Sequence, residues 1–264
     1  MTYYGLVSGL PDPQFGRPLG YDITSLKALI FSYADENDAH LLHHFFYRID
    51  LQNLLFYSEE QNLFLEGGNL QKEEIENWYK QLRTDVAPFD AVEVPENHDK
   101  QQFLDYLHQL WQIYYNTLNF LSDANTRRLW LYDISLRNFT AGHLFKKSGL
   151  EGEARYLEGG NFQRFDYAKL MLGDIQAEHP FQAATLACLE MDHPHERQSA
   201  MADSNRKFYD YVAFFEPFGI SGLMSWMMKA LDVMEAENYH TETGATRLKT
   251  FSENILNITE QQLI

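Results

Sequence analysis

The chain has 264 residues, of which 45% are apolar and 15% aromatic, so it can fill a substantial core and is not mainly disordered. Its 21 Lys and Arg against 38 Asp and Glu give a net charge of −17, which repels phosphate backbones and anionic lipid. We therefore expect no nucleic-acid partner. Cys188 is the only cysteine, which excludes an intramolecular disulfide and a four-thiolate metal site and fits a cytoplasmic compartment.

No segment of the chain is predicted to enter a membrane. A secretory signal has Lys or Arg before its apolar stretch, and the first ten residues carry neither. The longest apolar tract, residues 219–234, is interrupted by Lys229 and Asp232 and is shorter than the roughly 20 apolar residues of a membrane span. We expect no direct insertion into a membrane.

Helical periodicity runs through almost the whole chain, which predicts an all-α fold. Only residues 3–10 could form a short strand instead. N-cap residues are expected at Asp22 or Thr24 and again at Asn125 or Thr126, and Gly149 is a natural stop. The clearest helices are predicted over residues 24–33, 38–47, 103–121, 125–147 and, as a buried Met- and Trp-rich helix, 220–234.

Two breaks in this periodicity suggest how the chain is divided. Residues 87–99 hold two prolines and several acidic residues, and residues 191–195 are centred on Pro194. We expect helical units over residues 1–86, 99–190 and 191–264.

One heptapeptide occurs twice. Residues 65–71 read LEGGNLQ and residues 157–163 read LEGGNFQ, with six of seven positions identical. Each is preceded by Leu-x-Asn and an apolar residue, at positions 51–54 and 136–139. This order predicts two copies of one helical unit, over residues 38–86 and 123–178, with Asn69 and Asn161 as N-caps. The Gly-Gly pairs are predicted to form turns rather than phosphate sites, because no P-loop lysine follows them.

Histidines are the main candidates for metal chemistry. His40, His43 and His44 are spaced to share one helix face, and His193 and His195 form a second cluster. No HExxH motif is present, and nothing in the sequence brings the two clusters together. A metal-dependent hydrolase that uses both clusters therefore stays an alternative, while the main prediction has no metal ligand and no cofactor.

Nucleophile motifs are absent as well. The chain has no GxSxG sequence, and Cys188 lies in an apolar helical stretch where a buried, inert thiol is expected. The sequence therefore predicts no catalytic residue and a protein that is not an enzyme.

Charge is uneven along this acidic chain. Residues 127–169 carry eight basic residues against five acidic ones. This segment is either an ordinary solvated face or a docking surface for an acidic partner. For the second case, the candidate partner-binding residues are Arg127, Arg128, Lys146 and Lys147.

Three segments together resemble a known family: residues 3–11 (YYGLVSGLP), the Asp- and Asn-containing helices around 50–55 and 133–139, and residues 214–220 (FFEPFGI) before the Met-rich helix. They resemble a bacterial family of unknown function that is encoded among V-type ATPase genes. That family is similar to the C subunit of V/A-type ATPases, which is called the d subunit in eukaryotes.

The resemblance implies internally repeated helical bundles like those of the C subunit, and a non-catalytic role. The expected function is a structural or coupling subunit, or an assembly factor, that links the central stalk of a V-type ATPase to its membrane ring. The expected partners are other V-type ATPase subunits, and the expected location is the cytoplasm, at the inner face of the membrane through those partners. A helical protein-binding module with an unrelated partner is the remaining alternative.

Overall fold

The computed structural model describes residues 3–14, 17, 20–58, 64–82, 84–95, 99–117, 123–147, 156–158 and 182–237. Within these ranges the regular secondary structure is helical and includes no strand, so the predicted all-α class is confirmed. No helix in the described part of the chain is long and apolar enough to cross a membrane. Gly149 and Asn161, which were predicted as a helix stop and an N-cap, lie outside the described residues.

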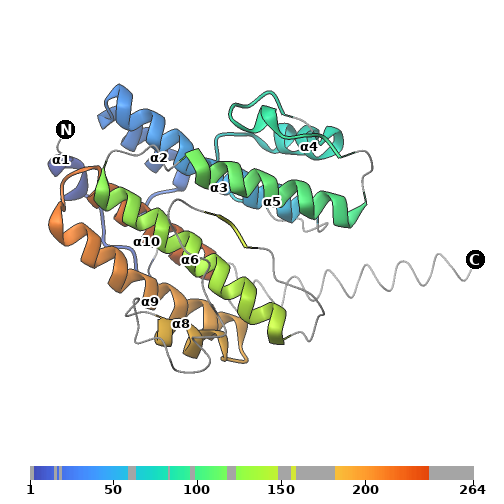
Figure 1. Ribbon diagram of the computed structural model, residues 1–264. Helices are drawn as coiled ribbons and strands as arrows, with labels where there is room; N and C mark the ends of the chain where they lie inside the picture. Colours follow the sequence, from blue (N-terminus) through green and yellow to red (C-terminus); the bar gives the residue numbers. More distant parts are fainter. Residues whose placement is uncertain are drawn as a thin grey trace, which may run out of the picture.

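The described helices follow the predicted order, with longer bounds in several cases. Their bounds are α1 Tyr4–Val7, α2 Ile23–Tyr33, α3 Glu36–Ser58, α4 Lys72–Gln81, η1 (a 3-10 turn) Phe89–Ala91, α5 Lys100–Thr117, α6 Ala124–Lys147, α8 Gln182–Leu189, α9 Pro194–Phe215 and α10 Ile220–Glu237 (Figure 1).

Local sequence explains where these helices begin. Asp22 is the predicted N-cap of α2, and its Oδ1 accepts a hydrogen bond from the Ser25 N–H at 2.8 Å. Asp123 has the same role at α6, where its carboxylate accepts from the Thr126 N–H. The predicted caps Asn125 and Thr126 are therefore wrong by two or three residues. The alternative of a strand over residues 3–10 is also wrong, because α1 occupies its centre.

The helices pack as two groups around one main apolar core, and a small second cluster joins α6, α8 and α9. α4 and α5 lie against α3, while α9 and α10 form a close pair that packs against α6 and α8 (Figure 1). The buried helix predicted from its Met and Trp residues is confirmed in α10, where Met224 and Met228 are fully buried and Trp226 is 5% exposed. Side chains link the two groups, since Arg48 of α3 contacts Met228 of α10 and the Tyr115 hydroxyl of α5 donates to Asp133 of α6.

α3 and α6 carry the same sequence pattern 85 residues apart. Residues 47–53 read YRIDLQN and residues 132–138 read YDISLRN, so four of seven positions are identical. The two helices run in the same general direction in Figure 1. Where they meet, the rings of Phe45 and Trp130 are 5.6 Å apart, and Arg48 Nη1 lies 2.9 Å from Asp133 Oδ1.

Both contacts join residues at matching positions, since each pair is separated by the same 85 residues as the motif. Equivalent residues face each other in this way where two units meet at a twofold axis. The crossing of α3 and α6 therefore has approximate twofold character at Phe45, Arg48, Trp130 and Asp133.

Candidate functional site

Asn53 and Asn138 make the same pair of hydrogen bonds to two segments that we call the first and the second connector. The first connector follows α3 and begins its LEGGN sequence at Leu65, and the second follows α6 and begins its LEGGN sequence at Leu157. Asn53 Nδ2 donates to the Leu65 carbonyl at 2.9 Å, and the Leu65 N–H donates to Asn53 Oδ1 at 2.7 Å. Asn138 Nδ2 donates to the Leu157 carbonyl at 2.7 Å, and the Leu157 N–H donates to Asn138 Oδ1 at 2.8 Å. Each connector is thus fixed to its helix at the same point.

A second pair of matching residues holds the connectors from the preceding helices. Lys27 of α2 donates through Nζ to the carbonyls of Gly67, at 3.3 Å, and Gly68, at 2.5 Å. Gln112 of α5, 85 residues later, donates to the Glu158 carbonyl at 2.5 Å and accepts from its N–H at 2.7 Å. A cation contacts the first connector, whereas a neutral amide contacts the second.

The two glycines of the first connector have separate structural reasons. Gly67 has a φ of +92°, and a Cβ there would lie 2.4 Å from Ile23 Cγ1. A Cβ on Gly68 would lie 2.1 Å from Asp50 Oδ1. The predicted glycine turn is therefore confirmed at Gly67, whereas Gly68 is required by its packing against Asp50, which the sequence pattern did not show.

The N–H groups of this turn already have an anionic partner. Asp50 accepts hydrogen bonds from the N–H groups of Asn69, at 3.0 Å, and Leu70, at 3.1 Å. Burial raises the pKa of Asp50 to about 6, although these two hydrogen bonds and the charge of Lys27 oppose the rise. The Asp50 carboxylate occupies the position that a phosphate would take at such a turn.

The predicted N-cap role of Asn69 is wrong. Helix α4 begins at Lys72, its N-cap residue is Gln71, and the Gln71 N–H donates to Glu74 Oε2 at 2.7 Å, as in a capping box. Asn69 instead donates through Nδ2 to the His43 carbonyl at 2.8 Å and so joins the connector to α3.

A buried polar network lies at the crossing of α3 and α6. Arg48 and Asp133 are 6% and 3% exposed, and Asp133 also accepts from the Tyr115 hydroxyl and lies 3.4 Å from Arg137 Nε. Burial by itself raises the pKa of Asp133, but the two arginines outweigh it and hold the pKa below its ordinary value. This network is paired and enclosed, so it holds helices together rather than presenting a reactive group.

The first histidine cluster is divided by its surroundings. His40 and His43 are exposed, and the His43 ring lies 4.4 Å from that of Phe31. His44 is buried, stacks on Tyr114 at 4.7 Å, and has Nε2 2.8 Å from the Tyr114 carbonyl. Burial lowers the pKa of His44, which favours its neutral form.

The second histidine cluster and Cys188 complete the candidates for chemistry. His193 is the N-cap residue of α9, and the side chain of His195 lies outside the described residues. Across the described ranges, no three His, Cys, Asp or Glu side chains come together as a metal site would require. Cys188 is buried as predicted, and burial raises the pKa of its thiol.

The four predicted partner-binding residues, which we call the basic quartet, occupy both ends of α6. Arg127 and Arg128 lie in its first turns and Lys146 and Lys147 in its last, and all four are exposed. At a rise of about 1.5 Å per residue the two ends are about 27 Å apart. Lys147 Nζ also lies 3.6 Å from Glu190, so the basic quartet forms two cationic points rather than one patch.

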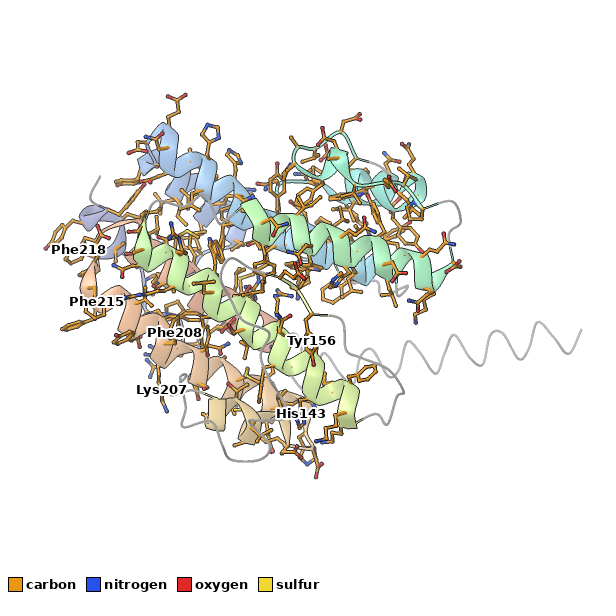
Figure 2. The ribbon with its side chains drawn as sticks, viewed as in Figure 1. His143, Tyr156, Lys207, Phe208, Phe215 and Phe218 are labelled. Atoms are coloured by element: carbon orange, nitrogen blue, oxygen red, sulfur yellow. The ribbon has the colours of Figure 1, made fainter. Side chains whose placement is uncertain are left out.

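The sequence interpretation missed an exposed group of aromatic side chains, which we call the aromatic surface. It contains Tyr4 (61% exposed), Tyr211 (53%), Phe214 (80%), Phe215 (54%) and Phe218 (36%). Ring centroids are 4.7 Å apart for Tyr4 and Phe218, 5.2 Å for Tyr211 and Phe215, and 5.8 Å for Phe214 and Phe215. In Figure 2, Phe215 and Phe218 project from the same end of the molecule. The FFEPF sequence was the available signal.

Comparison of the chain with curated proteins and with solved structures finds no match. Residues 1–138, which include α1 to α5 and the first half of α6 with both Asp133 and Asn138, match a family described as proteins of unknown function, DUF2764. This match covers more than half of the 264 residues, and the chain therefore belongs to the DUF2764 family.

Proposed function

We propose that this protein is a non-catalytic structural or coupling subunit, or an assembly factor, of a V-type ATPase, with repeated helical bundles like those of the C subunit. The observation that carries the proposal is the matched geometry of Asn53 with Leu65 and Asn138 with Leu157. Four hydrogen bonds with the same donors and acceptors, at matching points of two similar sequences, support descent from one helical unit. Repeated helical bundles are what the resemblance to the C subunit implies.

The polar chemistry of the interior also supports a structural role. Asp50 is paired with backbone N–H groups, and the Arg48 and Asp133 pair is enclosed between helices. Groups that act on a substrate need to reach a surface or a cavity, whereas these groups join one segment of the chain to another. These hydrogen bonds and this ion pair therefore make the fold rigid, and a coupling element requires rigidity.

In this proposal the basic quartet provides two docking points on one rigid helix. Separate cationic ends, about 27 Å apart, suit contacts with two acidic regions, such as those of a stalk protein and a ring-associated protein. Exposed charges of this kind influence association rates more than folding stability.

Co-purification from the native host tests the proposal. A tagged full chain expressed at its natural level is expected to recover V-type ATPase subunits in fixed proportion, and deletion of its gene is expected to reduce the assembled complex on native gels. Recovery of other proteins without any V-type ATPase subunit, together with an unchanged complex in the deletion strain, would refute it.

A further inference from the structure

The aromatic surface is large for a face that is left open to water. Its five side chains leave about 600 Å² of mostly apolar area exposed, taking about 200 Å² for each whole side chain. That sum is about the size of the largest apolar patch on a typical monomer and about three quarters of the roughly 800 Å² that each partner buries in a standard interface. Aromatic anchors dominate the binding energy of such interfaces.

Most of the exposed charges beside this surface are carboxylates. Asp12 and Asp210 are 48% and 53% exposed, while their cationic partners Arg206 and Lys229 are only 25% and 12% exposed. The cations therefore lie beneath the acids rather than beside them. Glu216, which lies between Phe215 and Phe218 in sequence, is also exposed. Lys207, one turn before Tyr211, is the exposed cation on this part of α9.

We propose that the aromatic surface docks an amphipathic segment of another protein, with an apolar stripe that is flanked by Lys or Arg. The stripe covers Phe214 and Phe215, and the flanking cations pair with Asp210 and Glu216. Arginine on such a segment can also lie over the exposed aromatic rings, which attract cations. The inference stands independently of the V-type ATPase proposal, because it names the partner by its chemistry.

Charge argues against the two other occupants of an exposed aromatic face. A second copy of the chain would bring together two molecules of net charge −17 through the same acid-rimmed surface. An anionic membrane would repel the same carboxylates, since such surfaces attract basic rather than acidic segments. A basic partner removes both difficulties.

Site-specific photo-crosslinking in cells tests the proposal with the full chain. p-Benzoylphenylalanine replaces Phe214, which is 80% exposed, and in a control chain it replaces Leu104, which is 37% exposed near the start of α5. Figure 1 places the start of α5 at the opposite end of the molecule from the last turn of α9. Mass spectrometry then identifies the crosslinked segment.

We expect the Phe214 position to crosslink to an apolar-striped segment with flanking Lys or Arg, and the Leu104 position to give a yield at least about tenfold lower. Raising the salt from about 0.05 to about 0.5 M in cell extracts is expected to lower the yield, because screening weakens the ionic rim. A crosslink to a second copy, to lipid or to a segment without basic residues would overturn the proposal, as would the absence of any crosslink. Whether the crosslinked protein is a V-type ATPase subunit reports only on the proposed function.

A conservative variant separates the ionic rim from the aromatic centre. Glu216→Gln keeps an oxygen that can accept from the Ser221 hydroxyl, which lies 3.2 Å from Glu216 Oε2, but removes the charge. We expect this variant to reduce the salt dependence of crosslinking while retaining the same crosslinked segment. An unchanged salt dependence in Glu216→Gln and in a matching Asp210→Asn variant would overturn the ionic part of the proposal.

Discussion

Replacing Asn53 with alanine removes the two hydrogen bonds that fix the first connector to α3. Asn53 is 1% exposed, and the bonds measure 2.9 and 2.7 Å. Each hydrogen bond contributes about 1 kcal/mol net to stability. In the variant, the N–H and carbonyl of Leu65 lose their partner and must be hydrated instead, which costs further free energy. We therefore expect Asn53→Ala to lower the free energy of unfolding by about 2 to 4 kcal/mol. For a chain of this size, that corresponds to a fall in Tm of about 4 to 8 °C.

The matching variant Asn138→Ala removes the equivalent bonds at Leu157. Asn138 is only half-buried, so we expect a smaller loss of about 1 to 3 kcal/mol. Asn37→Ala, at an exposed position of α3, is the control and should change stability by less than about 0.5 kcal/mol.

Urea and thermal unfolding followed by circular dichroism measure all three variants. Losses below about 0.5 kcal/mol in both Asn53→Ala and Asn138→Ala would refute the reasoning, because the paired bonds would then contribute nothing to the native fold.

Three further variants test other features. Gly68→Ala should lower the free energy of unfolding by about 2 to 3 kcal/mol, because the new Cβ would lie 2.1 Å from Asp50 Oδ1. In the control Gly5→Ala the new Cβ meets no atom within 4 Å, so this variant should be tolerated. Equal stability of the two variants would contradict this prediction. The folded pKa of Asp50 is raised to about 6 from 3.8, so its contribution favours folding at low pH and is lost as pH rises through about 6. The stability of the wild type relative to Asp50→Asn should therefore fall by about 2 kcal/mol between about pH 4.5 and 7.5 in urea titrations, and a rise would show the opposite shift. Reversing the basic quartet to Glu should slow association with the native partner while leaving Tm within a few degrees. A control that reverses four other exposed cations should bind at the normal rate. Equal slowing in both variants would assign the effect to net charge. These control positions are Arg17, Lys72, Lys80 and Lys100.

Short-range signals in the sequence predicted much of the fold. The apolar spacing of three and four residues and the cap at Asp22 depend on neighbours along the chain, and the helices α2, α5, α6 and α10 follow them. The cap at Asn69 was wrong because its amide has partners from α3 and α2, at His43 and Lys27, that lie far away in sequence. The Gln71 and Glu74 pair at capping-box spacing was a usable local signal for the true start of α4.

The candidate surfaces depended on information of a different kind. The basic quartet was identified by local charge, but only helix length shows that its two halves are far apart. The FFEPF sequence signalled aromatic residues at the aromatic surface but not their exposure, because Tyr211, which is exposed, and Tyr209, which is buried, are the same residue type and lie on one helix. Burial on α9 is decided by the packing of α6, α8 and α10 against it, and the sequence pattern does not contain that packing.

The ion pair between Arg48 and Asp133 determines how the two halves of the chain can associate. If two identical units met at this axis, the same residue would stand on both sides, and two buried arginines or two buried aspartates would repel. An attractive ion pair at this point therefore requires two units that differ in sequence. Because a single gene encodes both units, a mutation can change one position without changing the other. Expressed as separate polypeptides, the two halves should therefore recombine with each other and leave no homodimer of either.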